Sequence, residues 1–516
     1  MLKRFSKQSW AVLIIILIGV IFRLYHLFIV PMDQPFRLGG LFYEFSRQIS
    51  HHNFAFPQEI PYYSLGGIPF AYPPLSFYAQ ALLIRWLHPP LFWTVNLLPP
   101  LITLLTLPAF YWMIKQFTDD SHLLLAGLFT FALMPQAFIF QVEAAGLAEA
   151  FGLLALLLYL GMIFRWKVTP TLRNTVLAGL ALGGCVLSSP GSAYAAALLS
   201  VLLFIWLSIK SLKARAFKAI GLLILVGVIG MIVSAPYWLT VMRNHGINFF
   251  VSPFLGQHQT SESSFQQITS ILSFQPAGIY LGFIWNWLIL AGLFWAALNR
   301  QFLALAIFWT FWLIPREGTW LVATPAAILA GMGIVYILTP LLKKVFQRGT
   351  QGRPPLAPGI LVTLLVVGVF ANTLITIHAF IADEDWYIDS NQITSLEKFQ
   401  NAIPDGSGVI VIGNTALAEW APALIQREVL NIEYGLEWQP DELQKVQAIN
   451  AALEEVNWAL VIPAIEEYAQ DQLIYLVATP EGFAALQGTL PPSASLSLID
   501  TTPGLLLYTL EIFHQD

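Results

Sequence analysis

Long apolar runs alternate with short polar connections from residue 10 to about residue 382. A helix needs about 20 apolar residues to cross the hydrocarbon core of a bilayer. Eleven runs are close enough to this length to be predicted as membrane-spanning helices, so the chain is expected to be an α-helical polytopic membrane protein. The predicted spans cover residues 10–30, 91–113, 122–140, 147–164, 174–190, 191–209, 219–241, 276–298, 302–315, 320–342 and 359–381.

A further apolar segment, residues 73–87, begins after Tyr72 with two prolines and carries Arg85. We interpret it as a helix lying in the outer interface, because cytoplasmic loops carry the excess of Lys and Arg. With eleven spans and a cytoplasmic N-terminus, 16 of the 25 basic residues lie on the inner side. A twelfth span at 73–87 would move 13 of these 16 outside. The sequence thus predicts long outer loops at about 31–90 and 242–275.

The apolar pattern ends near Asp383, so we divide the chain into a membrane domain, residues 1–382, and a soluble C-terminal domain, residues 383–516. With eleven spans, this second domain is extracytoplasmic. Its pattern alternates between strand-like and helix-like segments, which is typical of an α/β fold. We predict strands at 408–413 and 458–463, helices at 415–426 and 441–453, and a hairpin at 496–510.

Composition agrees with this division. Hydrophobic residues make up 57% of the chain and charged residues 11%, and the mean hydropathy is +0.67. Soluble domains carry about 25% charged residues. The net charge of −5 gives no indication of nucleic-acid binding, and a single cysteine, Cys185, excludes an intramolecular disulfide. The basic residues before the first apolar run resemble a signal peptide, but the run is long, and a retained span is expected.

The first outer loop carries two candidate catalytic acids, Asp33 and Glu44. Residues 39–49 have helical spacing, with Glu44 and Gln48 one turn apart. A carboxylate facing a cavity at the membrane can act as a general base toward a hydroxyl acceptor, and burial would raise its pKa. The alternatives are a solvated loop acid, or an ion pair between Glu44 and Arg47.

Four further charged residues are candidates for substrate binding. Glu143 and Glu149 flank the start of the fourth predicted span and could bind a sugar hydroxyl or a divalent cation; the alternative for Glu149 is an acid favoured by the helix dipole. Arg316, and Arg37 in the first loop, are basic candidates. A guanidinium can grip a lipid phosphate with two hydrogen bonds; the alternatives for Arg316 are a pair with Glu317 or snorkelling. No cluster has the spacing of a metal site, so no metal or cofactor is predicted.

The order of these features resembles the GT-C superfamily of polytopic membrane glycosyltransferases, including its uncharacterised prokaryotic members such as the 6-pyruvoyl-tetrahydropterin-synthase-related membrane proteins. The resemblance covers nearly the whole membrane domain. The residues that carry it are GGIPFAYPPL at 66–75, Glu149, SSPG at 188–191, and Arg316 before PAAILAGMG at 325–333.

The resemblance implies transfer of a sugar from a polyprenyl-phosphate donor to an extracytoplasmic acceptor, with inversion. It implies that an acid of the first outer loop, Asp33 or Glu44, activates the acceptor and that Arg316 holds the phosphate. One departure is that Asp33 lies unusually close to the first span, followed by Arg37-Leu38-Gly39-Gly40. The expected location is a prokaryotic plasma membrane. The alternatives are a transporter or lipid flippase, and a non-catalytic protein of envelope assembly.

Overall fold

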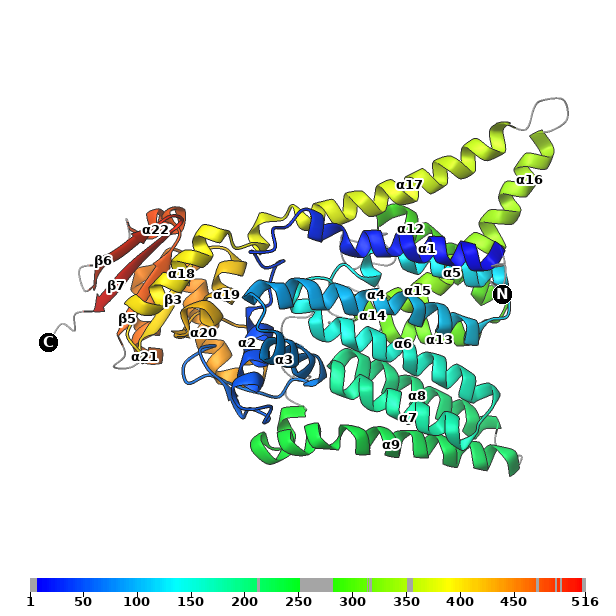
Figure 1. Ribbon diagram of the computed structural model, residues 1–516, viewed down its shortest axis with the longest axis horizontal. Helices are drawn as coiled ribbons and strands as arrows, with labels where there is room; N and C mark the ends of the chain where they lie inside the picture. Colours follow the sequence, from blue (N-terminus) through cyan, green and yellow to red (C-terminus); the bar gives the residue numbers. More distant parts are fainter. Residues whose placement is uncertain are drawn as a thin grey trace.

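The computed structural model is elongated, with a bundle of long helices joined at one end to a smaller domain that contains a β-sheet (Figure 1). The N-terminus lies at the opposite end of the bundle from this domain, which the C-terminal part of the chain forms. The structure describes residues 7–210, 214–250, 282–312, 314, 318–349, 356–469, 473–487, 490–491 and 494–512.

In the described part of the chain, seven helices are long and apolar enough to cross a membrane, and four shorter apolar helices accompany them. Each predicted span falls on one of these eleven helical segments, although residues 276–281, 313 and 315 lie outside the described residues. The bundle helices are α1 (Lys7–Leu24), α4 (Leu91–Phe117), α5 (Ser121–Leu133), α6 (Leu147–Val168), α7 (Leu172–Ser188), α8 (Pro190–Lys210), α9 (Ala214–His245), α12 (Gly282–Leu298), α13 (Phe302–Trp312), α15 (Ala323–Met332) and α17 (Leu356–Ile381).

The predicted span at 320–342 is interrupted. It begins with the short helix α14 (Gly318–Leu321), continues through α15, passes through a π-helical turn at Gly333–Leu338, and ends in α16 (Thr339–Gly349). Gly333 lies against α12, where a Cβ atom would meet the carbonyl oxygen of Leu288 at 2.4 Å. The wider π turn lies where these two helices make this close contact.

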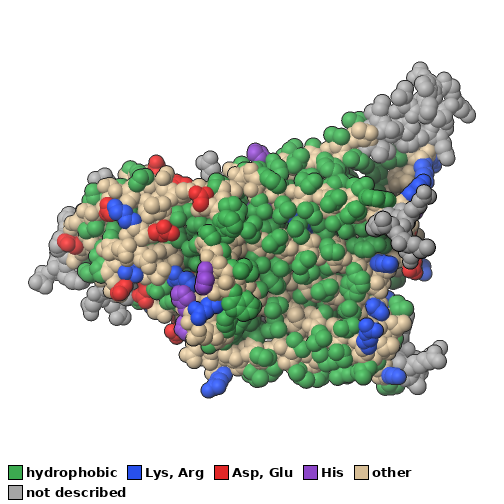
Figure 2. Space-filling view, in the orientation of Figure 1, with side chains coloured by type: hydrophobic (Ala, Val, Ile, Leu, Met, Phe, Trp, Pro, Cys, Tyr) green, Lys and Arg blue, Asp and Glu red, His purple; other side chains and the backbone are tan. Residues whose placement is uncertain are grey.

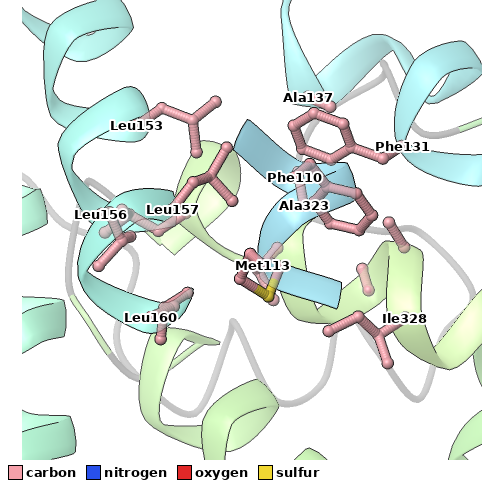
Figure 3. Packing of buried hydrophobic residues seen from close by; sticks show 14 of the residues in the cluster. Phe110, Met113, Phe131, Ala137, Leu153, Leu156, Leu157, Leu160, Ala323 and Ile328 are labelled. Carbon is pink, nitrogen blue, oxygen red and sulfur yellow. The ribbon is translucent and has the colours of Figure 1, made fainter. Parts of the chain in front are cut away.

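The bundle has an apolar interior and an apolar exterior. Phe110 stacks on Phe131 with ring centroids 4.1 Å apart, and Met113 and Leu157 are fully buried beside them (Figure 3). Large apolar side chains such as Ile21 are exposed, and hydrophobic side chains cover most of the face of the bundle that Figure 2 shows. An exterior of this kind requires lipid as its solvent.

Arg23 is fully buried near the end of α1 and is held by backbone carbonyls. Its guanidinium donates to the carbonyl oxygens of Phe131 and Ala132 at 3.3 and 3.0 Å, and lies over the ring of Phe138. These carbonyls belong to the last turn of α5, where no N–H group of the same helix is left to donate to them. The hydroxyl of Thr373 donates to the following carbonyl, that of Leu133. The arginine therefore caps a helix end inside the bundle.

The C-terminal domain has a five-stranded sheet in the order β4-β3-β5-β7-β6. The strands β3, β4 and β5 are parallel, whereas β7 is antiparallel to both β5 and β6. The predicted strand at 408–413, both predicted helices and the hairpin are confirmed. The elements are α18 (Ser390–Ala402), β3 (Gly408–Ile412), α19 (Thr415–Ile425), β4 (Glu428–Val429), α20 (Pro440–Glu454), α21 (Trp458–Ala469), β5 (Ile474–Ala478), α22 (Pro480–Gln487), β6 (Ala494–Thr502) and β7 (Leu505–Ile512).

The predicted strand at 458–463 is wrong, because this segment is the start of helix α21. A short apolar run does not by itself distinguish a buried strand from a buried helix. The buried positions here are Trp458, Val461, Ile462 and Ile465, which follow the helical period of three to four residues. The missing strand is β5, which begins at Ile474.

The segment between α1 and α4, predicted as the first outer loop and called so below, forms a compact layer between the bundle and the C-terminal domain (Figure 1). It contains α2 (Gly40–His51), a small pairing of β1 (Glu59–Ile60) with β2 (Ile68–Pro69), and α3 (Leu75–Leu87). Helix α3 is the helix expected at 73–87. It runs alongside α2 in the same direction, since Phe42 meets Phe77 and Ser46 donates to Gln80.

Candidate active site

The segment that links α1 to α2, residues 33–41, is held by the bundle on one side. Asn96 of α4 accepts a hydrogen bond from the backbone N–H of Phe36 at 2.9 Å. At the start of the α6 region, the N–H of Ala144 donates to the carbonyl of Phe36 and that of Ala145 to the carbonyl of Leu38, at 3.1 and 2.7 Å. The backbone of this segment is therefore fixed against two bundle elements.

The C-terminal domain holds the other side of the same segment through helix α19. The buried carboxylate of Glu419 accepts hydrogen bonds from the backbone N–H groups of Gly39, Gly40 and Leu41 at 3.0, 2.9 and 2.9 Å. The indole of Trp420, also buried, donates to the carbonyl of Arg37 at 2.9 Å. The segment between α1 and α2 thus contacts both domains.

Arg37 has the left-handed backbone conformation, with φ at +65°, which is uncommon for a residue with a side chain. Strained backbone of this kind is kept only where the surroundings enforce it, and it is concentrated at functional sites. Here the Trp420 hydrogen bond to the carbonyl of Arg37 and the contacts of the neighbouring residues enforce it.

The Arg37 side chain is enclosed by an acid and by aromatic rings. Its Nε lies 3.1 Å from Oε2 of Glu143, and its Nη1 donates to the carbonyl of Phe380 at 2.8 Å. The guanidinium carbon lies 3.7 Å from the ring centre of Phe380 and 4.9 Å from that of Trp386. Burial raises the pKa of Glu143 to about 7, even though the charge of Arg37 opposes the shift.

Tyr387 lies beside this ion pair. Its ring packs against Phe36, with centroids 6.1 Å apart, and its hydroxyl is close enough to Arg37 and Glu143 to feel their charges. Burial raises the pKa of this hydroxyl, which therefore stays protonated at neutral pH. Within the described residues this hydroxyl oxygen is buried and makes no hydrogen bond.

Asp33 lies at the start of the fixed segment and is exposed to solvent. The hydroxyl of Ser390, the first residue of α18, donates to its Oδ2 at 3.3 Å. The same hydroxyl accepts a hydrogen bond from Gln34 at 2.9 Å. The carboxylate therefore lies at the junction of bundle, first outer loop and C-terminal domain, and its surface remains accessible.

Glu44 has a different environment. Its side chain is fully buried in α2, where Arg47 lies 2.7 Å from Oε2 and Gln48 donates to Oε1 at 2.6 Å. Burial raises the pKa of Glu44, and these two partners oppose the shift. This is the ion pair with Arg47 that the helical spacing left as an alternative to a catalytic acid.

Two predicted site residues remain, Glu149 and Arg316. Glu149 is half-buried in the first turn of α6, six residues after Glu143. Arg316 lies outside the described residues, as does most of the predicted outer loop at 242–275. Within the described ranges no three His, Cys, Asp or Glu residues are grouped to hold a metal ion.

The sequence interpretation missed Glu419, Trp420 and Tyr387 as site residues. One local signal pointed to a missing partner: α2 begins at Gly39-Gly40, where no side chain can cap the helix. Four N–H groups at a buried helix start need acceptors. The acceptor lies about 380 residues away in the chain, so its identity required the fold.

Comparison with known proteins identifies the fold. No family model matches the chain, and no curated protein matches it in sequence. The chain aligns over 98% of its length with 98% of the ArnT chain from Cupriavidus metallidurans bound to undecaprenyl phosphate, with 14% identity and a TM-score of 0.58. It also matches the Archaeoglobus fulgidus oligosaccharyltransferase AglB in complex with an inhibitory peptide and a dolichol-phosphate, over 97% of this chain and 74% of AglB, with 15% identity and a TM-score of 0.57.

A third match is the mycobacterial arabinofuranosyltransferase AftD. The alignment covers 99% of this chain and 42% of the AftD chain, with 13% identity and a TM-score of 0.56. All three similarities include both the bundle and the C-terminal domain, because they cover almost all of this chain. The expected GT-C fold is therefore confirmed, as a multi-pass membrane fold with a small C-terminal α/β domain.

Proposed function

We propose that this protein is a membrane glycosyltransferase that uses a polyprenyl-phosphate-linked sugar as its donor. The observation that carries the proposal is the fold, which it shares over nearly the whole chain with structures that hold undecaprenyl phosphate and dolichol-phosphate. The exposed carboxylate of Asp33, beside the fixed segment that joins bundle and C-terminal domain, supports the same proposal.

In this proposal Asp33 is the general base. The acceptor hydroxyl oxygen attacks the anomeric carbon of the sugar from the face opposite the phosphate, while its proton passes to the Asp33 carboxylate. The bond between the anomeric carbon and the phosphate oxygen breaks, and polyprenyl phosphate leaves with the electron pair. The sugar is transferred with inversion. We choose Asp33 over Glu44 because Glu44 is buried and paired with Arg47.

The remaining groups are assigned by their chemistry. Tyr387, whose buried hydroxyl has no partner in the described part of the chain, can donate to a phosphate or sugar oxygen. Arg37 forms the wall of the same region, its charge offset by Glu143. Arg316 remains the predicted phosphate ligand, and Glu149 a predicted sugar ligand.

We also propose that the N-terminal end of the bundle is cytoplasmic and the C-terminal domain extracytoplasmic, in a prokaryotic plasma membrane. Basic side chains gather at the N-terminal end (Figure 2), and they include Lys115 in the last turn of α4 and Arg165 and Lys167 in the last turn of α6. This arrangement agrees with the excess of Lys and Arg in cytoplasmic loops. The site would then face polyprenyl-linked donors at the outer leaflet.

The test is release of free undecaprenyl phosphate. The purified protein, reconstituted in vesicles, is incubated with a panel of undecaprenyl-phosphate monosaccharides and with an envelope extract as the acceptor source. We expect release from at least one donor. Asp33→Asn should lower the rate by about 10²–10⁴-fold, the usual contribution of a general base. The control is Asp405→Asn, a 94% exposed acid of the C-terminal domain, which should keep the wild-type rate.

Three results would contradict this proposal. Absence of release from every donor by folded wild-type protein would remove the transferase assignment. Uptake of intact donor into vesicles would favour a flippase. A full rate in Asp33→Asn, with loss in a folded Glu44→Gln variant, would transfer the role of base to Glu44.

A further inference from the structure

The C-terminal domain and the first outer loop share one hydrophobic core. Side chains from both regions belong to the same buried cluster, including Leu41 and Phe45 from α2 and Trp420 and Leu424 from α19. Each of these four is no more than 5% exposed. The two regions are far apart in the chain, so this shared core forms only when the domain packs against the loop.

The backbone of the loop also extends the sheet of the domain. Tyr63 forms a parallel bridge with Val429 of β4, at the sheet edge. The N–H of Val429 donates to the carbonyl of Tyr62 at 2.9 Å, and the N–H of Ser64 donates to the carbonyl of Val429 at 3.2 Å. An edge strand offers unpaired N–H and C=O groups, and here the first outer loop pairs with them.

Glu419 makes the most specific contact between the two regions. Helix α2 begins at Gly39-Gly40 without a cap of its own, and three of its free N–H groups point to this single carboxylate. A negative charge at a helix N-terminus is stabilised by the helix dipole, and charge-assisted hydrogen bonds are about twice as strong as neutral ones. The hydroxyl of Tyr63 donates to the backbone carbonyl of the same residue at 3.1 Å.

We propose that Glu419 is a positioning residue for the reaction, since it caps α2 and thereby fixes the segment at residues 33–41 that presents Asp33. This inference rests on the proposed function, because it gives that function a second requirement, the C-terminal domain. Without the carboxylate, the start of α2 loses three acceptors, and the Arg37 backbone loses part of what enforces its strained conformation. A displacement of about 1 Å at a reacting group can lower a rate by about 10²-fold.

The experiment measures amide exchange and kinetics in the full-length protein. In Glu419→Ala, exchange at the N–H groups of residues 39–41 should become at least about tenfold faster, and kcat should fall by about 10–100-fold with the donor KM nearly unchanged. Glu419→Gln keeps one acceptor oxygen, so its amide exchange at residues 39–41 and its kcat should lie between those of Glu419→Ala and the wild type. The matched control is Glu428→Ala, a half-buried acid of the same domain that accepts a hydrogen bond from the N–H of Gly66 in this loop.

The exchange measurement tests the contact between Glu419 and α2, and the kinetic measurement tests its effect on the reaction. Unchanged exchange at residues 39–41 in both Glu419 variants would overturn the contact. Faster exchange with a wild-type kcat would overturn the positioning role. If the wild type releases no polyprenyl phosphate from any donor, the proposed function fails and positioning fails with it, whereas exchange still decides whether Glu419 caps α2. An equal kcat loss in Glu428→Ala would reduce Glu419 to one of many structural contacts.

Discussion

At the scale of single residues, the charged groups at the end of the bundle next to the C-terminal domain differ in their surroundings. Glu44 and Glu143 are each paired with an arginine, at 2.7 and 3.1 Å, whereas Asp33 is exposed. Removing one partner of a buried pair leaves an uncompensated charge and costs about 3–5 kcal/mol. Glu44 and Glu143 therefore each need their arginine partner, whereas the carboxylate of Asp33 is accessible to solvent.

Glu143 makes the stability of this region depend on pH. Its folded-state pKa, about 7, lies above its ordinary value, so the fold favours the protonated form. The stability that it contributes is complete below about pH 4.5 and is lost as the pH rises toward 7. Glu143→Gln should therefore show a smaller fall in melting temperature between pH 5 and pH 8 than the wild type, by about 1–4 °C.

The measurement is the melting midpoint of the purified protein across this pH range. Glu455→Gln, which changes an exposed glutamate of the C-terminal domain, is the control and should follow the wild-type curve. If Glu143→Gln also followed the wild-type curve, the carboxyl would not be titrating in this range.

At the scale of elements, the start of α2 is fixed by close packing as well as by hydrogen bonds. Gly39 has φ at +155°, and a Cβ atom there would lie 2.4 Å from the Cβ of Ala144. Gly66, in the same loop, has φ at +74° with nothing within 4 Å of a Cβ position. Both glycines have a positive φ, but only at Gly39 would a Cβ atom overlap a neighbour. Comparing alanine substitutions at the two positions therefore distinguishes steric overlap from backbone strain.

Gly39→Ala should destabilise the protein more than Gly66→Ala, by about 1–3 kcal/mol, the usual cost of overpacking. Gly66→Ala should show only the cost of a positive φ, about 1–2 kcal/mol. Thermal unfolding in detergent compares the two. If the two variants had equal melting midpoints, the start of α2 and the segment before α6 would not be in close contact.

Whether an element could be predicted from the sequence depended on how local its signal is. Apolar runs of span length and the pattern of α2 lie in the sequence itself, and they gave correct helices. The strand predicted at residues 458–463 was wrong because a short apolar run fits both the two-residue period of a strand and the longer period of a helix. Only the burial of Val461 and Ile465, four residues apart, shows that the segment is a helix. The partner of the uncapped helix, Glu419, comes from the other end of the chain, where no local pattern points to Gly39.

At the scale of the whole molecule, the division into a membrane domain and a separate soluble domain describes composition better than it describes packing. The segment after α1 is pinned between Asn96 of the bundle and Glu419 of the C-terminal domain. Sheet, core and hydrogen bonds all join the first outer loop to that domain. The proposed active site lies at this junction, where Ser390 and Glu419 of the C-terminal domain contact the segment.

The most direct test of this account is photolabelling with a polyprenyl phosphate that carries a photoreactive group next to the phosphate. We expect crosslinks to peptides that contain residues 33–41, residues 380–390 or Arg316, and we expect excess undecaprenyl phosphate to remove them. Crosslinks confined to other parts of the chain, or crosslinks at these peptides that undecaprenyl phosphate does not compete away, would contradict it.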